Sequence, residues 1–188
     1  MEKHEQIRLF KERAEAVQTF VAEIAELRQA FRYAIEITKE QGGLTIAAPG
    51  LDRQDTAALP ALQALCEESG LTLLTENLRS AIGRLHTGFT IADHAIAETA
   101  TLVQDSSSED LRIATMLSEI HIAVLPASRI RPDAMALEAE LKDSLQAPPR
   151  YLAFISGASR TADIERVLTI GVHGPQELHV LVLPEETP

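Results

Sequence analysis

Residues that could bind an anion are concentrated in one short segment near the end of the chain. An apolar run over residues 151–155 leads into a loop rich in hydroxyl groups and glycine, which contains Ser156, Gly157, Ser159, Arg160 and Thr161. A guanidinium can donate two parallel hydrogen bonds to a carboxylate or phosphate, and nearby hydroxyls can complete the shell of donors. Gly157 permits close approach of the backbone, and the N–H groups of a helix predicted to start here would favour an anion. The segment therefore predicts a binding site between two strands.

A purely structural interpretation of the same loop stays open. Ser159 or Thr161 could cap the following helix, and Arg160 could pair with Asp163 or Glu165. The sequence contains neither of the glycine-rich phosphate-binding motifs, GxxxxGK[ST] or GxGxxG, that would favour a nucleotide site.

Two further segments carry groups that could act on a ligand. The turn over residues 171–175 holds His173 next to Gly174, which would expose an imidazole able to exchange a proton near neutral pH. Glu98 lies where a turn enters a strand, and its carboxylate could be a base, a nucleophile or an acceptor for a substrate hydroxyl. Alternatively, His173 could form a hydrogen bond with the backbone of its own turn, and Glu98 could form an ion pair with an arginine.

The residue types argue against a metal or a cluster held by this chain. His94, His121 and His173 could be imagined as ligands, but no pair has the i, i+4 or HExxH spacing of a metal site. The single cysteine, Cys66, excludes an internal disulfide and an iron–sulfur cluster held by the cysteines of one chain. It falls in a helical pattern, which favours a buried, inert thiol. No cofactor is assigned, and no metal is expected.

Composition narrows the class of partner. The chain has 188 residues and a formal net charge of −11, which would repel the phosphates of nucleic acid. It has no run of 18 apolar residues and no targeting segment, so we expect a cytoplasmic protein without a membrane span.

The pattern along the chain predicts an α/β fold with an added N-terminal helix. Residues 3–40 read as one long amphipathic helix, because Phe10, Val17, Ile24 and Phe31 recur every seven residues. That apolar stripe could pack on its own domain or on another subunit, which would make a homo-oligomer possible. From residue 44 short apolar runs alternate with helical segments, which predicts a mainly parallel central sheet flanked by helices. We therefore divide the chain into residues 1–40, the helix, and 41–188, the α/β domain.

Four blocks of this sequence resemble the LUD-domain family of lactate-utilisation protein C. They are Gly88–Thr99 (GFTIADHAIAET), His121–Pro126 (HIAVLP), Ile155–Glu165 (ISGASRTADIE) and Gly171–Leu183 (GVHGPQELHVLVL). Two departures stand out: the family usually has glycine where this chain has Ala100, and it favours a proline-containing approach to His121. An alanine restricts the backbone at that turn and puts close approach of a ligand there in question.

The resemblance implies a fold similar to the NagB/RpiA/CoA-transferase superfamily. It also implies a role in oxidation of lactate to pyruvate, as a non-redox subunit or accessory protein beside iron–sulfur and cysteine-rich partner proteins. An acyl- or CoA-transferase or a nucleotide-dependent ligase with Glu98 as nucleophile is the alternative from the same superfamily, and a scaffold that docks partners through its N-terminal stripe is the third.

Our leading hypothesis is that a small carboxylate or phosphate-bearing ligand binds where Arg160 and His173 converge. Because ligands of open α/β sheets bind beyond the carboxyl ends of the strands, we expect the site at that edge.

Overall fold

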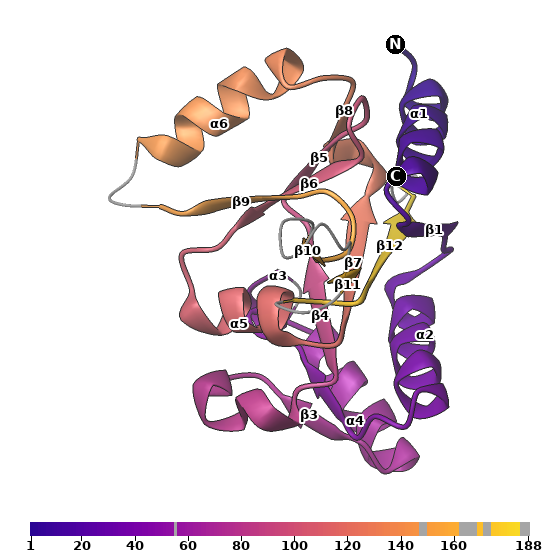
Figure 1. Cartoon of the computed structure of the whole chain (residues 1–188), viewed down its shortest axis with the longest axis vertical. Helices are drawn as coiled ribbons and strands as arrows, with labels where there is room; N and C mark the ends of the chain where they lie inside the picture. Colours follow the sequence, from indigo (N-terminus) through magenta and orange to yellow (C-terminus); the bar gives the residue numbers. More distant parts are fainter. Residues whose placement is uncertain (55, 147–149, 162–168, 171–173, 185–188) are drawn as a thin grey trace.

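The computed structural model describes residues 1–54, 56–146, 150–161, 169–170 and 174–184. In this part of the chain the centre of the fold is a six-stranded parallel sheet (Figure 1). Its strands, in spatial order, are β1 (Phe20–Glu23), β12 (Glu177–Leu183), β7 (Ile120–Pro126), β4 (Thr87–Ile91), β2 (Thr45–Ala47) and β3 (Thr72–Leu74). The predicted α/β fold with a mainly parallel sheet flanked by helices is confirmed.

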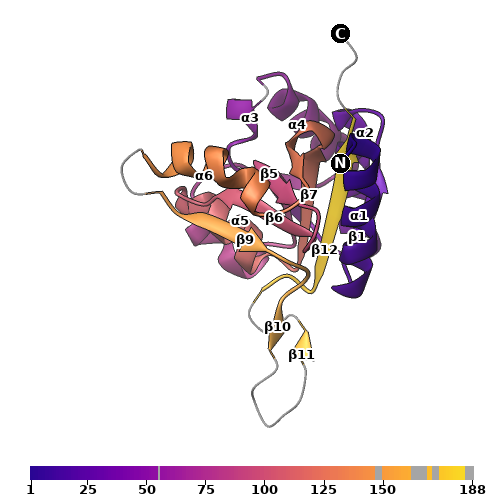
Figure 2. The same ribbon diagram turned by 90° about the horizontal axis from the view of Figure 1, so that it is seen from above.

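A second, four-stranded sheet lies beside the first and is mostly antiparallel. Its order is β8 (Ile130–Arg131), β5 (His94–Ile96), β6 (Thr101–Asp105) and β9 (Leu152–Ile155), with β8 and β5 parallel. A short antiparallel pair, β10 (Arg160–Thr161) and β11 (Thr169–Ile170), extends away from the body of the molecule (Figure 2).

Helices cover both faces of the central sheet, with α2 (Leu27–Glu40) and α4 (Ala58–Ser69) on one face and α1 (Lys3–Ala16) on the other, while α6 (Glu138–Leu145) packs against the second sheet. The other described helical segments are α3 (Leu51–Gln54), α5 (Glu109–Leu117) and the 3-10 segments η1 (Leu78–Arg84), η2 (Ala127–Arg129) and η3 (Met135–Leu137). Alternate side chains of β7 enter different cores, as a strand requires. Ile122 packs with α2 and α4, whereas Leu125 packs with α1 and the second sheet. Strand β7 is therefore apolar along its length because both of its faces are buried.

The predicted continuous helix over residues 3–40 is wrong. The helix ends at Ala16, Gln18 adopts a left-handed conformation with φ +56°, and β1 then pairs in parallel with β12. Of the four residues with the seven-residue spacing, Phe10 lies in α1 and Phe31 in α2, whereas Val17 and Ile24 lie on either side of β1. The β1 sequence, Phe20–Glu23, begins with residue types that favour extended structure. Pairing with a strand more than 150 residues away overrides the helical pattern, so residues 20–23 belong to the central sheet.

The pairing of two predicted strands also differs from expectation. Residues 87–91, to which no element was assigned from the sequence, form the central strand β4. The predicted strands near residues 99–104 and 151–155 exist, but they pair with each other in the second sheet and not in the parallel one. Arg160 and Thr161 form β10, and the residues over which the predicted helix would continue, 162–168, lie outside the described residues.

Ala100 occupies a backbone conformation that suits glycine. It lies in the turn between β5 and β6 with φ +49°, and its side chain is buried. A left-handed conformation costs a residue with a side chain about 1–2 kcal/mol. The turn therefore keeps its shape under local strain.

We predict that Ala100→Gly changes the free energy of unfolding by less than about 1 kcal/mol, because relief of the left-handed strain offsets the lost methyl group and the greater chain entropy. Ala97→Gly is the matched control, since Ala97 is equally buried in the same turn but has no positive φ. It should cost about 1–2 kcal/mol. Urea unfolding of both variants measures this difference, and equal losses would contradict the assigned strain.

Candidate functional site

Several predicted site residues line one cavity at the amino ends of β7 and β12. The cavity has a volume of about 270 Å³ and includes Ser156, Gly157, Ser159 and Gly174. Its other lining residues come from α5, β7, β9, the start of β12 and the loops after β9 and before β12: Thr115, Met116, His121, Ala153, Phe154, Ile155, Ala158, Pro175 and Leu178. We call it the amino-end cavity. Its position corrects our expectation of a site formed by these residues at the carboxyl ends of the strands.

A chain of hydroxyl groups holds Ser156 at the rim. The Ser156 hydroxyl lies 2.6 Å from that of Thr101, which in turn lies 2.7 Å from that of Thr99. The antiparallel pairing of β6 with β9, which places Leu102 opposite Ile155, brings these groups together. Hydroxyls both donate and accept, so Ser156 can offer either function to a ligand.

Gly157 and Arg160 both contact the carbonyl of Val17, in the turn between α1 and β1. Gly157 has φ +77°, and a Cβ atom there would lie 2.7 Å from that carbonyl oxygen. Arg160 Nη2 donates to the same oxygen at 2.5 Å and lies 3.5 Å from Gln18 Oε1. Glycine is thus required for the loop to approach the turn, and Arg160 fastens it there. Arg160 is exposed and is not among the lining residues of the cavity.

The turn before β12 closes the other side of the cavity. Ser159 N donates to Pro175 O at 2.8 Å, and Gln176 N donates to Glu119 O at 2.7 Å. A Cβ atom on Gly174 would lie 2.9 Å from Ser159 Cβ, so the two chains pass in close contact. Both loops therefore depend on each other for their position.

His121 is a lining residue that our site prediction did not include. Its Nε2 lies 2.9 Å from the hydroxyl of Thr90 on β4, while Nδ1 is buried and has no hydrogen-bond partner among the described residues. Burial, and secondarily the charge of His179, lower the pKa of His121 to about 4. The imidazole is therefore neutral at physiological pH. The signal available in the sequence was a histidine inside an otherwise apolar strand. That signal did not show a cavity beside it, because the cavity is formed by segments that are distant in the sequence.

The remaining predicted residues have different places. Glu98 is exposed in the turn after β5 and is not among the residues lining the cavity. Thr161 continues from Arg160 in β10. His173 lies outside the described residues, so its convergence with Arg160 stays a prediction.

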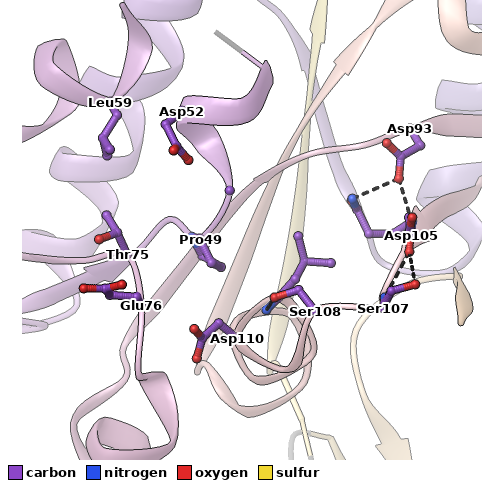
Figure 3. A pocket seen from close by; sticks show the side chains of 13 residues that line it. Pro49, Asp52, Leu59, Thr75, Glu76, Asp93, Asp105, Ser107, Ser108 and Asp110 are labelled. Atoms are coloured by element: carbon purple, nitrogen blue, oxygen red, sulfur yellow. Dashed lines mark hydrogen bonds between the residues drawn. The ribbon is translucent and has the colours of Figure 1, made fainter. Parts of the chain in front are cut away.

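A larger cavity of about 430 Å³ lies at the carboxyl ends of β2, β3 and β4 (Figure 3). We call it the carboxyl-end cavity, and sequence reasoning did not identify it. Its lining is strongly acidic and hydroxyl-rich: Asp52, Glu76, Asp93, Asp105, Ser107, Ser108 and Asp110, with Pro49, Gly50, Leu59, Thr75, Gln104 and Leu111. The available signals were Pro49-Gly50 after a predicted strand and the Ser107–Asp110 helix start.

Several of these carboxylates already serve the backbone. Asp110 accepts hydrogen bonds from the N–H groups of Asn77 and Leu78 at 3.0 and 2.8 Å. Asp93 accepts one from Asp105 N at 2.6 Å (Figure 3). Burial opposes ionisation of Asp105, but hydrogen bonds from Ser107 and the charge of Arg150 outweigh it and lower the pKa of this carboxyl. The carboxyl-end cavity is thus anionic and would repel an anion.

The chemistry of the remaining candidates is limited. Within the described ranges, no three His, Cys, Asp or Glu side chains are grouped so that they could hold a metal ion. The predicted burial of Cys66 is confirmed, and burial, with a smaller effect of Glu67, raises the pKa of its thiol to about 11. None of the helices among the described residues has both the length and the hydropathy that crossing a membrane needs.

Comparison with known proteins gives a consistent family. The family model described as the LUD domain matches residues 7–183. Lactate utilization protein C of Exiguobacterium sp. is 42% identical over 104 residues, which are 53% of this chain and 45% of that protein. The uncharacterized protein YkgG of Escherichia coli is 28% identical over 171 residues, 87% of this chain and 73% of that protein. The aligned part of the chain spans about half the length of the lactate utilization relatives it matches.

A solved structure has the same fold. The crystal structure of a DUF162 family protein from Deinococcus radiodurans superposes with a TM-score of 0.63 at 21% identity, over 97% of this chain and 99% of that one.

We predict that His121 destabilises the fold in acid. Its pKa is about 4 in the folded protein and 6.5 as the ordinary value, so between these pH values the unfolded chain binds a proton that the folded chain does not. The contribution of His121 to the free energy of unfolding is fully present above pH 6.5. It falls by up to roughly 3 kcal/mol as the pH drops to 4. His121→Gln should flatten that part of the profile of unfolding free energy against pH, whereas the exposed His4→Gln should not. Parallel profiles for wild type and His121→Gln would contradict the neutral imidazole.

Proposed function

This chain belongs to the LUD domain family, and from that premise we propose that it serves lactate utilisation by binding a small anion in the amino-end cavity. The ligand class is a carboxylate or a phosphate-bearing molecule. The proposal takes the pathway from relatives named lactate utilization protein C, and the ligand class from the residues that line the cavity.

The observation that carries the proposal is the convergence of the four sequence blocks on which the family resemblance depends. The first supplies Thr90, which supports His121 of the second, and also Thr99 of the hydroxyl chain. The third supplies the loop with Ser156, and the fourth supplies Gly174. Of the residues lining the carboxyl-end cavity, only Asp93 belongs to these blocks.

Charge also favours this cavity for an anion. No acidic side chain is among the described residues that line it, although the whole chain carries a net charge of −11. Ser156 and Ser159 line it, and Arg160, which is not among the lining residues, follows Ser159 in the sequence. The Arg160 guanidinium has five N–H donors, and its two hydrogen bonds to the α1–β1 turn both use Nη2. We assign the other N–H groups of Arg160 to the anion as donors. His173, which lies outside the described residues, is the second residue that we predict to contact the anion.

The proposed place in the pathway is that of a non-redox subunit or accessory protein. A chain with one buried cysteine cannot hold a cysteine-ligated iron–sulfur cluster, so the electron carriers would be iron–sulfur and cysteine-rich partner proteins. The transferase or ligase alternative needs Glu98 as a nucleophile at the site, whereas Glu98 is exposed and is not among the residues that line the amino-end cavity.

Ser159→Ala should weaken binding of L-lactate and inorganic phosphate about tenfold or more, because a hydrogen bond to a charged group is lost. Isothermal titration of the full chain measures each affinity. Ser107→Ala is the matched control, since it removes a hydroxyl from the carboxyl-end cavity. The proposal fails if neither anion binds the wild-type chain, or if the Ser107 variant loses as much affinity as the Ser159 variant.

Arg160→Ala should weaken binding of the same anions more than Arg150→Ala does. Each variant removes one positive charge, but Arg150 pairs with Asp105 at the carboxyl-end cavity. Both exposed substitutions should lower the thermal midpoint by only a few degrees, roughly what about 1 kcal/mol produces. Unchanged affinity in Arg160→Ala, with a lowered midpoint, would limit Arg160 to fastening the loop to Val17.

A further inference from the structure

A groove with a volume of about 490 Å³ lies between α1 and the carboxyl ends of β1 and β12, and we call it the α1 groove. Helix α1 packs beside β12 (Figure 2), and η2, the segment after β7, contributes to the lining. Three neighbouring parallel strands, β1, β12 and β7, end here, whereas the carboxyl-end cavity lies beyond β2, β3 and β4. Ligands of open α/β sheets bind beyond strand ends of this kind. The α1 groove shares no lining residue with the two cavities described above.

Positive charge is concentrated along the α1 side of the groove. Lys3, His4, Arg8 and Lys11 line it, and Glu23 at the end of β1 is the only carboxylate among the described lining residues. With the histidine counted as neutral, three positive charges and one negative charge give the lining a net charge of +2, although the whole chain carries −11. The glutamates of α1 are not among the lining residues. The α1 groove therefore attracts an anion that most of the molecular surface would repel.

The contacts inside the groove leave the Arg8 guanidinium to a ligand. Lys3 Nζ donates to Ile130 O at 3.3 Å, which fastens the start of α1 to β8. Lys11 Nζ lies 2.5 Å from Glu23 Oε1, so the one carboxylate of the lining is neutralised. Arg8 is exposed and makes no hydrogen bond or ion pair with another described residue. A guanidinium has five N–H donors and can bind two oxygens of a phosphate in parallel.

The rest of the lining is apolar. Ile7 is half-buried and Pro184 is exposed, and Ala127 and Val182 form the buried floor between them. An inorganic anion would leave this surface in contact with water, whereas an alkyl or aryl group laid on it gains free energy in proportion to the apolar area that it covers. Apolar surface with a few charged groups, in a volume of this size, is typical of a small-molecule site.

We propose that the α1 groove is a second ligand site, for a small phosphate monoester that carries a short alkyl or aryl group. The phosphate binds Arg8, and the apolar group lies against Ile7 and Pro184. A phosphate monoester has a charge of about −1.5 to −2 at neutral pH, which the +2 of the lining balances. The site is independent of the amino-end cavity and does not depend on the proposed function.

A titration followed through side-chain methyl signals tests the proposal on the full wild-type chain. Ethyl, butyl and hexyl phosphate should each shift the signals of Ile7 and Val182, and the affinity should rise about tenfold or more from ethyl to hexyl phosphate, because the longer chain covers more of the apolar lining. Equal affinities across the series would overturn the apolar contact, and the absence of shifts at both residues would overturn the site.

The same spectra separate this proposal from the proposed function. Ile155 and Leu178 line the amino-end cavity, so an anion bound there changes their signals and not those of Ile7 and Val182. Failure of one site to bind is therefore visible independently of the other. Shifts confined to Ile155 and Leu178 would overturn the α1 groove as a site and leave the proposed function intact.

Two single substitutions on the same helix assign the phosphate to its partner. Arg8→Gln should weaken the binding of hexyl phosphate about fivefold, because a charged hydrogen bond is lost at an exposed position. Arg13→Gln is the matched control, since Arg13 is also exposed on α1 but does not line the groove, and it should change the affinity less than twofold. Glutamine keeps a high helix propensity in both variants. Equal losses in the two variants would reduce the effect to long-range charge and overturn the assignment to Arg8.

Two further measurements distinguish other occupants. Glu185 and Glu186 follow Pro184 in the sequence, and replacing both with glutamine should leave the affinity for hexyl phosphate within twofold. A tenfold gain would mean that these carboxylates compete for the groove, and the site would then belong to this chain's own acidic segment. Sedimentation with phosphatidic acid vesicles should leave the chain in solution, because Arg8 lies in a groove and not on a broad basic surface. Binding to the vesicles without binding of hexyl phosphate would overturn the proposal.

Discussion

The insertion of the last strand, β12, between β1 and β7 is the constraint on which the rest of the molecule depends. It pairs Phe20–Glu23 with His179–Val182 and, on its other edge, aligns Leu178 with His121. This pairing places β1, near the start of the chain, beside β12, near its end, in the central sheet (Figure 1). Val180 and Val182 are buried against α1 and the second sheet. The pairing also fixes where the preceding turn must lie, so that Gly174 and Pro175 meet the loop after β9 above His121. The amino-end cavity is a consequence of that register.

The carboxyl-end and amino-end cavities differ in charge, and the difference decides which kind of ligand each can hold. The carboxyl-end cavity is ringed by aspartates, several of which already accept backbone N–H groups, as Asp110 does from Asn77 and Leu78 (Figure 3). An anion there would meet uncompensated negative charge. The amino-end cavity has hydroxyls, backbone and one neutral imidazole instead. The usual expectation for parallel sheets would select the first cavity, whereas electrostatics selects the second for a carboxylate.

The sequence predicted local structure better than it predicted pairing. The alternation of short apolar runs with helical segments after residue 44 was recognised correctly, because strands buried on both faces, such as β7, leave a local signal in the sequence. The helix over residues 3–40 failed because only β12 makes Phe20–Glu23 a strand. The site loop was identified by its composition, but its place was not, since the run before it joins an antiparallel sheet. No local pattern shows that His121 faces a cavity and that Thr90 supports it, because three strands and two loops create that environment.

The alanine at position 100 affects the cavity through the backbone and not through contact. The Ala100 side chain is 1% exposed and lies in the core formed by α1, β7 and the second sheet. Its methyl group therefore does not point into the amino-end cavity. The left-handed turn that a glycine would adopt easily is still present, with φ +49°. Thr99 and Thr101 lie next to that turn, and their hydroxyls form the chain that ends at Ser156. The departure from the family pattern therefore costs local stability, while the geometry that presents Ser156 to a ligand is kept.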